Sequence, residues 1–214
     1  MGEFGVPSGW YVGGGPVIGK DVGVLALPSL AAASALIAAR RTNLRIDPHR
    51  PVDHALVGDL CRLATWAPNH HLTEPWRFAV LTGDARAELG RLTAEFVLAK
   101  GVADDDRLAK VRVKYMRAPL MLVVGCASSA GAHPDVVVED RDAVAAGLQN
   151  ILLGATAAGL CSFWGSGPVT EAPEVKTMCG FAAADQIVAV VYIGWPIGEV
   201  ATPQRRDAVI HWLS

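Results

Sequence analysis

The chain has 214 residues, 51% of them hydrophobic and 19% charged, which is the composition of a folded globular protein with a sizeable core. Its formal net charge of −2 offers no basic face to a nucleic acid or an anionic membrane, so we expect neither as a partner. The four cysteines have no CxxC spacing and no histidine at metal-binding spacing, which predicts reduced thiols in a cytoplasmic protein and no bound metal.

The first part of the chain contains a glycine-rich and proline-rich stretch and then an uncharged one. Residues 1–27 predict an irregular N-terminal arm, because glycine and proline interrupt regular structure. The uncharged stretch from Val22 to Ala39 is as long as a membrane span, but Pro28 interrupts it and alanine dominates it. We therefore expect Pro28 and Ser29 to cap an amphipathic helix over Leu30–Arg41, with secretion as the alternative interpretation.

The spacing of apolar residues predicts the later elements. Asp53 is placed to start a helix that Pro68 ends, and the run Asp104–Asp106 is expected to cap a helix and not to hold a metal. We expect helices over Val52–Ala67, Asp84–Lys100 and Arg107 to about Met116, then a central helix and a helical turn around Pro173–Cys179. We expect strands over Trp76–Leu81, which should be buried, Leu120–Cys126 and Gln186–Gly194.

The central helix is apolar on nearly every side. Residues such as Leu148 recur at helical spacing, and small residues such as Gly154 fill most other positions. Such a helix should be buried, and its small side chains would let another backbone, a partner subunit or a flat ligand approach closely. Asp140 and Asp142 are placed to favour its start, and Gly159 its end.

This order of elements predicts the fold class. Three expected strands are each preceded by helices, so we expect an α+β fold in which helix outweighs sheet. No internal repeat divides the chain, and residues 28–214 are therefore expected to form one domain.

The motifs GxGxxG, GxxxxGK[ST], GxSxG and HExxH are all absent. Four clusters of residues are nevertheless candidates for binding a ligand. Arg40–Thr42 joins two cations to a hydroxyl, which suits a phosphate but also suits the C-terminus of a helix. Asn69–His71 offers imidazoles; we expect adjacent histidines to point in different directions, which argues against a shared metal. Trp164–Gly167 predicts a glycine-flanked turn beside a planar ligand, or a simple turn. Arg205 and Arg206 are a second phosphate contact or surface charge.

The order of these clusters is more informative than any one of them. Arg-Arg-Thr follows the first helix, Ala67-Pro68 and a histidine-containing loop precede Pro75-Trp76-Arg77-Phe78, and Ala118-Pro119 precedes an apolar strand. The small-residue helix with its Trp-Gly-Ser-Gly segment and then Tyr-Ile-Gly-Trp-Pro complete the series. From about Leu30 to Pro196 the chain resembles the FMN-dependent nitroreductase family, and in particular its short members.

The resemblance implies a nitroreductase-like α+β fold, with a central mixed β-sheet flanked by helices, in an intertwined homodimer that binds FMN with both subunits. His70 would come from the other subunit, and Trp66 replaces a basic residue that often contacts flavin in short members. The positions implied as cofactor contacts are Arg40, Arg41, Thr42, Trp66, His70, Trp164, Gly165, Ser166, Arg205 and Arg206. Those implied for the nicotinamide nucleotide are Gly154, Ala155, Thr156, Ala157, Ala158 and Gly159.

The implied activity is reduction of nitroaromatics, quinones or similar electron-poor substrates with NADH or NADPH, by a ping-pong mechanism in one shared pocket. No side chain is expected to be catalytic, because the flavin carries the redox chemistry. Leu72-Thr73-Glu74 replaces the Asn-x-Gln that many members carry, which leaves open a flavin-binding storage or sensing protein with little turnover. A flavin-linked dehydrogenase or dehalogenase on the same fold is a further alternative.

Overall fold

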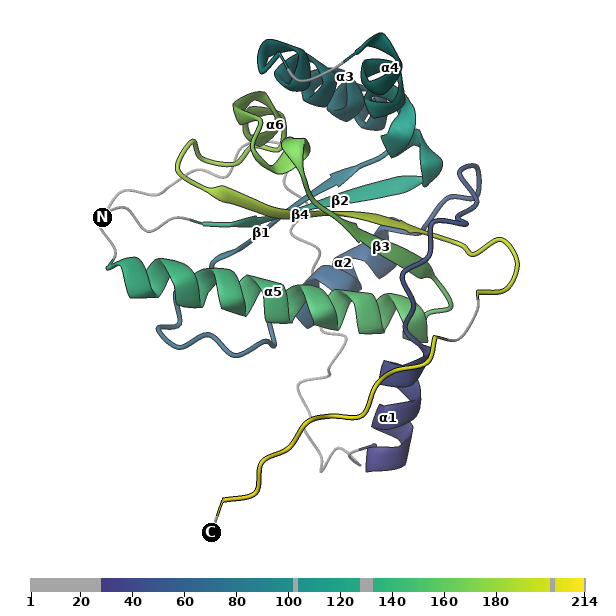
Figure 1. The fold of residues 1–214 in the computed structure, drawn as a ribbon, viewed down its shortest axis with the longest axis vertical. Coiled ribbons are helices and arrows are strands. Elements are labelled where there is room, and N and C mark those ends of the chain that lie inside the picture. Colours follow the sequence, from purple (N-terminus) through teal and green to yellow (C-terminus); the bar gives the residue numbers. More distant parts are fainter. Residues whose placement is uncertain (1–27, 102–103, 128–132, 201–202, 214) are drawn as a thin grey trace.

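A four-stranded sheet runs through the middle of the molecule (Figure 1). The computed structural model describes residues 28–101, 104–127, 133–200 and 203–213. The strands are β1 (Trp76–Leu81), β2 (Leu120–Cys126), β3 (Cys161–Gly165) and β4 (Gln186–Gly194), in the spatial order β1-β2-β4-β3. Each neighbouring pair is antiparallel, and β2 and β4, in the centre, are almost entirely buried.

Helices α2 (His54–Ala64) and α5 (Pro134–Ala157) cover the face of the sheet that points down in Figure 1. Their apolar sides form one hydrophobic cluster with β2 and β4, in which Leu148 and Ile151 are fully buried. The two helices approach closely at Gly147, where an added Cβ atom would lie 2.6 Å from the carbonyl oxygen of Ala64. The small residues of α5 therefore serve this helix contact.

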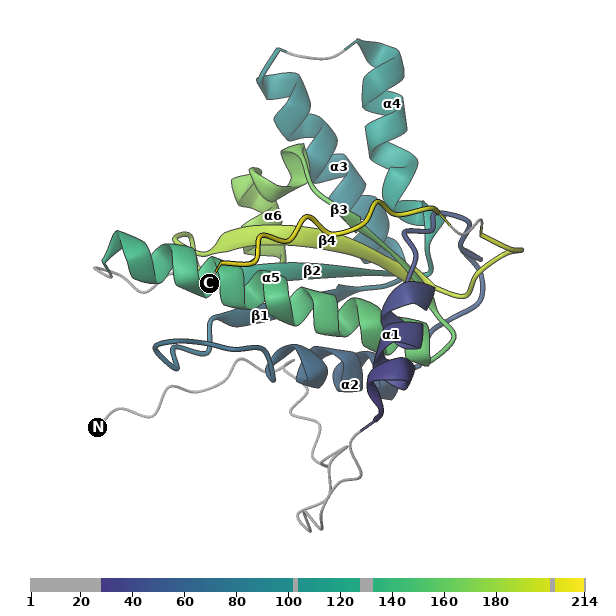
Figure 2. The ribbon, with the colours of Figure 1, turned by 60° about the horizontal axis from the view of Figure 1, so that its bottom comes forward.

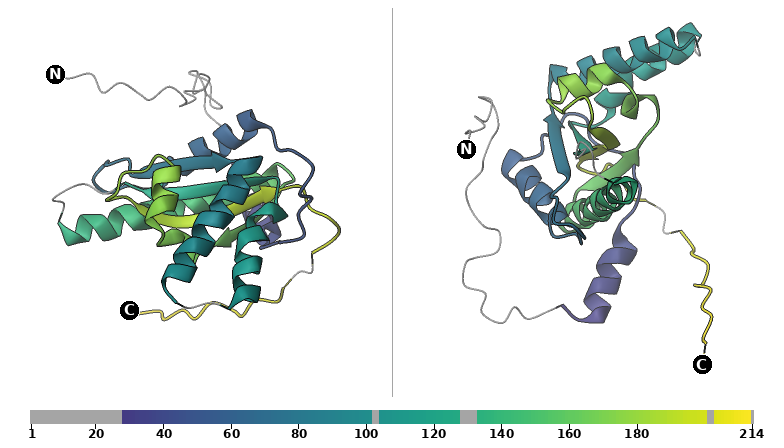
Figure 3. Two further views of the ribbon diagram at one scale, coloured as in Figure 1. Left: turned by 90° about the horizontal axis from the view of Figure 1, so that it is seen from above. Right: turned by 90° about the vertical axis from the view of Figure 1, so that its left-hand side faces the viewer.

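Helices α3 and α6 cover the opposite face, which is seen from above in the left panel of Figure 3, and α4 packs against α3. Helices α3 and α4 lie side by side (Figure 2), and a second hydrophobic cluster joins α3 and α6 to the sheet. The bounds are Asp84–Ala99 for α3, Asp105–Val113 for α4 and Pro173–Met178 for α6, with 3-10 helices at Lys114–Arg117 and Pro168–Thr170.

Helix α1 (Leu30–Ala39) and the extended segment 203–213 lie away from these layers, as Figure 1 and the right panel of Figure 3 show. None of the residues of α1 is buried, although the helix contacts α5. Residues 203–213 are exposed throughout, including Trp212 and Leu213, whose exposed fractions are 89% and 95%. The chain therefore presents apolar surface that its own core does not cover.

Several predictions of local structure are confirmed. The fold is of the α+β class, and the strands over Trp76–Leu81, Leu120–Cys126 and Gln186–Gly194 have the expected bounds. The caps are confirmed as well: the side chains of Ser29, Asp53 and Asp104 accept hydrogen bonds from backbone amides in the first turns of α1, α2 and α4. Gly159, with φ +75°, follows α5 as expected.

Other predictions are wrong in detail. The first helix has no buried face, so it is not amphipathic in the expected sense within one chain. Helix α5 begins at Pro134, so Asp140 and Asp142 lie inside it, and Asp140 is 2% exposed. Of the turn expected over Trp164–Gly167, Trp164 and Gly165 belong instead to strand β3, because their backbone pairs with β4.

Two expectations about the sheet also need correction. Strand β1 is mostly half-buried and not buried, because it lies at an edge of the sheet. The expected mixed sheet is antiparallel in all its strand pairs, and the parallel pairing found among the described residues is the isolated bridge between Thr42 and Ser162.

The expected arm over residues 1–27 lies outside the described residues, so the division into arm and domain stays a prediction. Within the described parts of the chain, no helix combines the length and the apolar character that crossing a membrane requires. Of the uncharged stretch from Val22 to Ala39, that finding covers only residues 28–39.

Candidate functional site

The end of α1 lies beside the outer edge of strand β3. Thr42 forms a parallel bridge with Ser162, and the amide of Asn43 donates a hydrogen bond of 3.0 Å to the carbonyl oxygen of Ser162. Among the described residues, the sheet order places β3 at an edge with no further strand beside it, and the segment after α1 pairs with that edge. Thus Arg40–Thr42 and Trp164–Ser166, far apart in sequence, are brought to the same region of the fold.

A pocket of about 410 Å³ opens at this end of β3. Its lining comes from the segment after α1, from the 3-10 helix Lys114–Arg117, from the end of β3 and from β4. The lining residues are Leu44, Lys114, Tyr115, Arg117, Phe163, Trp164, Gly165, Ser166, Val169, Val190 and Tyr192. The sequence predicted Trp164, Gly165 and Ser166 for the site, and the structure places all three at this pocket.

Two cations at the pocket were missed by the sequence analysis. Lys114 is half-buried and Arg117 is exposed. Burial lowers the pKa of the Lys114 ammonium, and the nearby charge of Arg117 lowers it further. An anion bound between the two side chains would relieve both effects, so the pocket has the electrostatics of an anion-binding site.

Aromatic rings form the floor of the pocket. Tyr192 stacks with Tyr115 at a centroid distance of 6.0 Å and meets Phe163 edge to face at 5.4 Å. Burial raises the pKa of Tyr192 to about 12 and raises that of Tyr115 as well. Both phenols are therefore protonated at neutral pH, so they can donate hydrogen bonds but do not act as bases.

Gly165 keeps the pocket open. A Cβ atom at this position would lie 3.3 Å from both the ring of Phe163 and the carbonyl oxygen of Val190. Backbone groups alternate along a strand, so Trp164 presents its amide to the same outer edge as Ser162, whereas Gly165, opposite Val190, faces β4. The free edge and the missing side chain together give a planar ligand room beside the backbone.

None of the predicted phosphate contacts lines this pocket. Arg40 and Arg41 are half-buried at the end of α1, and the Arg41 guanidinium donates hydrogen bonds to the carbonyl oxygens of Ala38 and Arg40. Neither arginine lines the pocket. Arg205 and Arg206 are exposed on segment 203–213 and do not line it either.

Trp66 and His70 lie in a different region, between α2 and β1. Trp66 is 71% exposed just after α2. His70 lines a second, open pocket of about 480 Å³ together with Pro68, Asn69, Glu139, Asp142, Ala143 and Ala146. Within one chain, the structure therefore does not bring Trp66 or His70 to the pocket of Trp164. A contribution of His70 to the site of another subunit stays a prediction.

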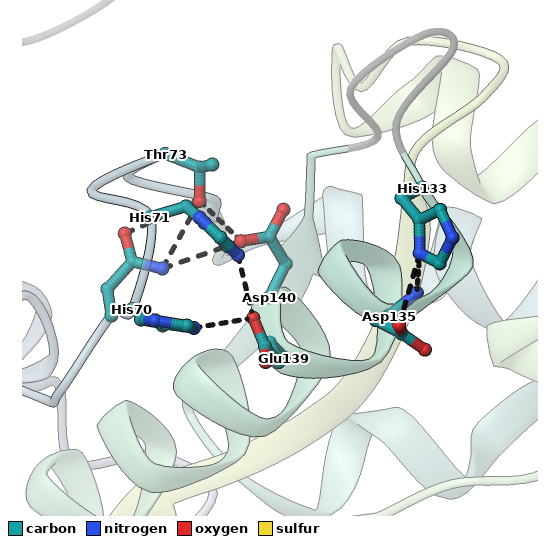
Figure 4. Close-up of polar contacts among 8 residues, drawn as sticks. His70, His71, Thr73, His133, Asp135, Glu139 and Asp140 are labelled. Carbon is teal, nitrogen blue, oxygen red and sulfur yellow. Dashed lines mark hydrogen bonds and ion pairs between the residues drawn. The ribbon is translucent and has the colours of Figure 1, made fainter.

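The expectation that His70 and His71 point in different directions is wrong. Nδ1 of His70 and Nε2 of His71 each lie 3.0 Å from the same carboxylate oxygen, Oε2 of Glu139 (Figure 4). The two ring centroids are 4.3 Å apart. The loop bends so that both imidazoles face helix α5, an arrangement that sequence spacing alone does not reveal.

The segment Gly154–Gly159 packs at the C-terminal end of α5. A Cβ atom on Gly154 would lie 2.6 Å from the side chain of Leu63, and Ala155 is fully buried. The Thr156 hydroxyl donates a 2.9 Å hydrogen bond to the carbonyl oxygen of Leu152. These contacts give the small residues a packing role; their assignment to a nicotinamide nucleotide stays a prediction.

The cysteines add no chemistry to either pocket. Burial raises the pKa of Cys61 and Cys179 to about 12 and that of Cys126 to about 11, and it raises that of Cys161 too. All four are free thiols. Each is therefore protonated at neutral pH and is a poor nucleophile.

Comparisons with known proteins agree with this fold. Residues 37–195 match the nitroreductase family. Over 161 residues, 75% of this chain and 86% of the relative, the sequence is 29% identical to Escherichia coli YdjA, whose name assigns it provisionally as an NAD(P)H nitroreductase.

Two solved structures share the fold. A nitroreductase-like protein from Bacillus cereus superposes with a TM-score of 0.69 at 23% identity and covers 86% of this chain and 95% of its own. A Bacteroides fragilis nitroreductase with bound FMN gives a TM-score of 0.65 at 20% identity. The match covers 85% of this chain and 98% of the Bacteroides fragilis chain. On the sequence match over most of its length, supported by this shared fold, the chain belongs to the nitroreductase family.

Proposed function

We propose that this protein is an FMN-dependent oxidoreductase that uses NADH or NADPH to reduce nitroaromatics, quinones or similar electron-poor compounds. The observation that carries the proposal is the pocket in which Lys114 and Arg117 face the edge of β3 at Trp164–Ser166. Family membership and the FMN bound in the Bacteroides fragilis relative support the choice of ligand.

The residues of the pocket fit a flavin. A flat aromatic ring system needs one open backbone edge, apolar contact on a face and polar contact at its rim. Gly165 leaves the space, Phe163 and Tyr192 supply the apolar floor, and Lys114 and Arg117 supply the positive charge. FMN, when bound, supplies the redox chemistry between the nicotinamide nucleotide and the acceptor.

The protein's own groups would bind and orient the cofactor. We assign Arg40, Arg41 and Thr42 to the phosphate, since guanidinium groups bind phosphate oxygens in pairs and the hydroxyl adds a donor. Arg205 and Arg206 are also assigned to the phosphate end of the cofactor. The backbone of Trp164 and Ser166 is assigned to the edge of the ring, and Gly165, whose backbone faces β4, is assigned to the space beside the ring.

Lys114 and Arg117 would stabilise negative charge on the cofactor where it increases during reduction, and this electrostatic role needs no proton transfer by a side chain. Because both substrates would use the one pocket in turn, we expect ping-pong kinetics, with parallel lines in double-reciprocal plots.

A second copy of the chain would complete the site with Trp66 and His70. The apolar side chains left exposed on α1 and on segment 203–213 support a dimer, because surface of this kind is usually covered in an assembly. Sedimentation velocity of the FMN-loaded protein is expected to give twice the chain mass of 22.5 kDa.

Ile37→Glu on α1 should shift the protein to monomers, since it would bury a charge in the interface. Leu98→Glu, which changes an equally exposed residue on α3 at the opposite face, should leave the dimer intact. A loaded monomer of the parent protein would contradict the assembly.

The redox role is tested by the visible spectrum. The purified protein is expected to be yellow and to lose its flavin absorbance within seconds when NADH or NADPH is added without oxygen. Recovery of the absorbance on adding a quinone would support the reductase. A yellow protein that neither nucleotide bleaches would support storage or sensing instead, and a protein that takes up no FMN would overturn the proposal.

A further inference from the structure

Beside helix α5, at a pocket that shares no lining residue with the pocket of Trp164, two imidazoles and a carboxylate converge (Figure 4). Nδ1 of His70, Nε2 of His71 and a carboxylate oxygen of Glu139 all lie within 4.8 Å of one another. Both nitrogen atoms are 3.0 Å from Oε2 of Glu139. We propose that His70, His71 and Glu139 bind a divalent transition-metal ion of the zinc type.

The set of donors fits such an ion. Two histidines and one glutamate are a ligand set that zinc uses where it keeps a further position open. Imidazole also suits nickel and copper, whereas calcium and magnesium prefer oxygen donors alone. A tetrahedral ion about 2.1 Å from each donor needs donors about 3.4 Å apart, and rotation of the exposed imidazoles closes the remaining difference.

The loop that precedes β1 is hydrogen-bonded to helix α5 beside the proposed site. Asp140, the residue after Glu139, is buried in helix α5 and accepts a hydrogen bond from the Thr73 hydroxyl and a 3.4 Å one from the Asn69 amide. The side-chain oxygen of Asn69 in turn accepts a 2.9 Å hydrogen bond from the amide of Glu74. These bonds fix the loop that carries both histidines against the helix that carries Glu139.

The loop holds a backbone conformation that it would not adopt on its own. Leu72 and Glu74 have φ values of 50° and 49°, in the left-handed region that side chains with a Cβ atom disfavour. Such conformations persist where surrounding contacts fix them. The bonds from Asp140 and Asn69 fix them here, and the result is that both imidazoles face Glu139.

The site has access to solvent and further ligands. It borders the open pocket of about 480 Å³ that Asp142 also lines. His70 uses only Nδ1 toward Glu139, so its Nε2 would stay available for FMN bound by a second copy of the chain, as proposed above. The metal site and the flavin site are thus compatible, and the proposal does not require that FMN binds.

Equilibrium dialysis of the full-length, untagged protein against Zn²⁺ tests the proposal, in a slightly alkaline, non-chelating buffer because metal ligands must be deprotonated. We expect one zinc ion per chain. His71→Ala and Glu139→Gln should each weaken binding by more than about tenfold, since even loss of an outer-layer partner costs that much. Neither residue is among those assigned to the flavin.

His133→Ala is the matched control. His133 forms the other exposed histidine–carboxylate pair in Figure 4, with Nδ1 3.1 Å from Asp135, and no third metal-binding side chain joins this pair among the described residues. Zinc retained by this variant and lost by the other two, all with the parent's circular dichroism spectrum, would support the site. No bound zinc in the parent, or equal zinc content in all four proteins, would overturn it.

Discussion

Replacing Lys114 and Arg117 together by alanine is expected to weaken FMN binding by about 100-fold. Each residue would lose a charge-assisted hydrogen bond worth about 1.5 kcal/mol or more, and two such losses change a dissociation constant by about two orders of magnitude. Both side chains line the pocket at β3, where burial and the charge of Arg117 lower the pKa of the Lys114 ammonium, so a bound anion would favour its charged form. Titration of the flavin-free protein with FMN, followed by fluorescence quenching, measures the effect.

The matched control is Lys110→Ala, which removes an exposed cation from the adjoining helix α4 without touching the pocket. Its affinity for FMN should equal that of the parent. An unchanged affinity in the double variant would show that the flavin does not occupy this pocket. The same titration with Arg40→Ala combined with Arg41→Ala tests the phosphate end separately, where we also expect weaker binding.

Gly90→Ala is expected to lower the free energy of unfolding by about 3 kcal/mol, with a fall in melting temperature of about 6–12 °C. Gly90 is buried in helix α3, where an added Cβ atom would lie 2.0 Å from the carbonyl oxygen of Arg112 in α4. That neighbour is backbone and cannot rotate away, so the two helices would have to separate. Urea unfolding at one fixed protein concentration measures the change.

Gly58→Ala makes the same substitution inside helix α2 and should raise the free energy of unfolding instead of lowering it. The atom nearest to its added Cβ is the end of the flexible Arg62 side chain, 3.6 Å away. Because alanine favours helix over glycine, this variant should gain about 0.5–1 kcal/mol. Equal stability of Gly90→Ala and the parent would mean that α3 and α4 do not pack as closely as described.

The candidate site was predictable only in part. Trp164, Gly165 and Ser166 were identified through the order of motifs, and all three lie at the pocket. Lys114 and Arg117 carried no sequence signal, because two cations near the end of a polar helix are ordinary surface residues in any chain. They become pocket residues because the 3-10 helix Lys114–Arg117 and strand β3 meet at the same end of the sheet.

The histidine loop shows the same limit. Sequence spacing suggests that neighbouring side chains diverge, yet His70 and His71 both face Glu139. Their directions depend on the hydrogen bonds of Asn69 and Thr73 with Asp140, a residue nearly seventy positions later in the chain. No local pattern contains that information.

By itself the sequence determined the elements whose cause is local. Apolar runs set the bounds of β1, β2 and β4, and single side chains such as Asp53 and Asp104 set helix starts through bonds to amides a few residues away. Tertiary structure alone decided that Cys161–Gly165 is a strand, because only five residues pair and they do so along one edge of β4. It also decided which charges meet at each pocket, because long-range packing of helices on the sheet, and not spacing along the chain, fixes the distances between distant side chains.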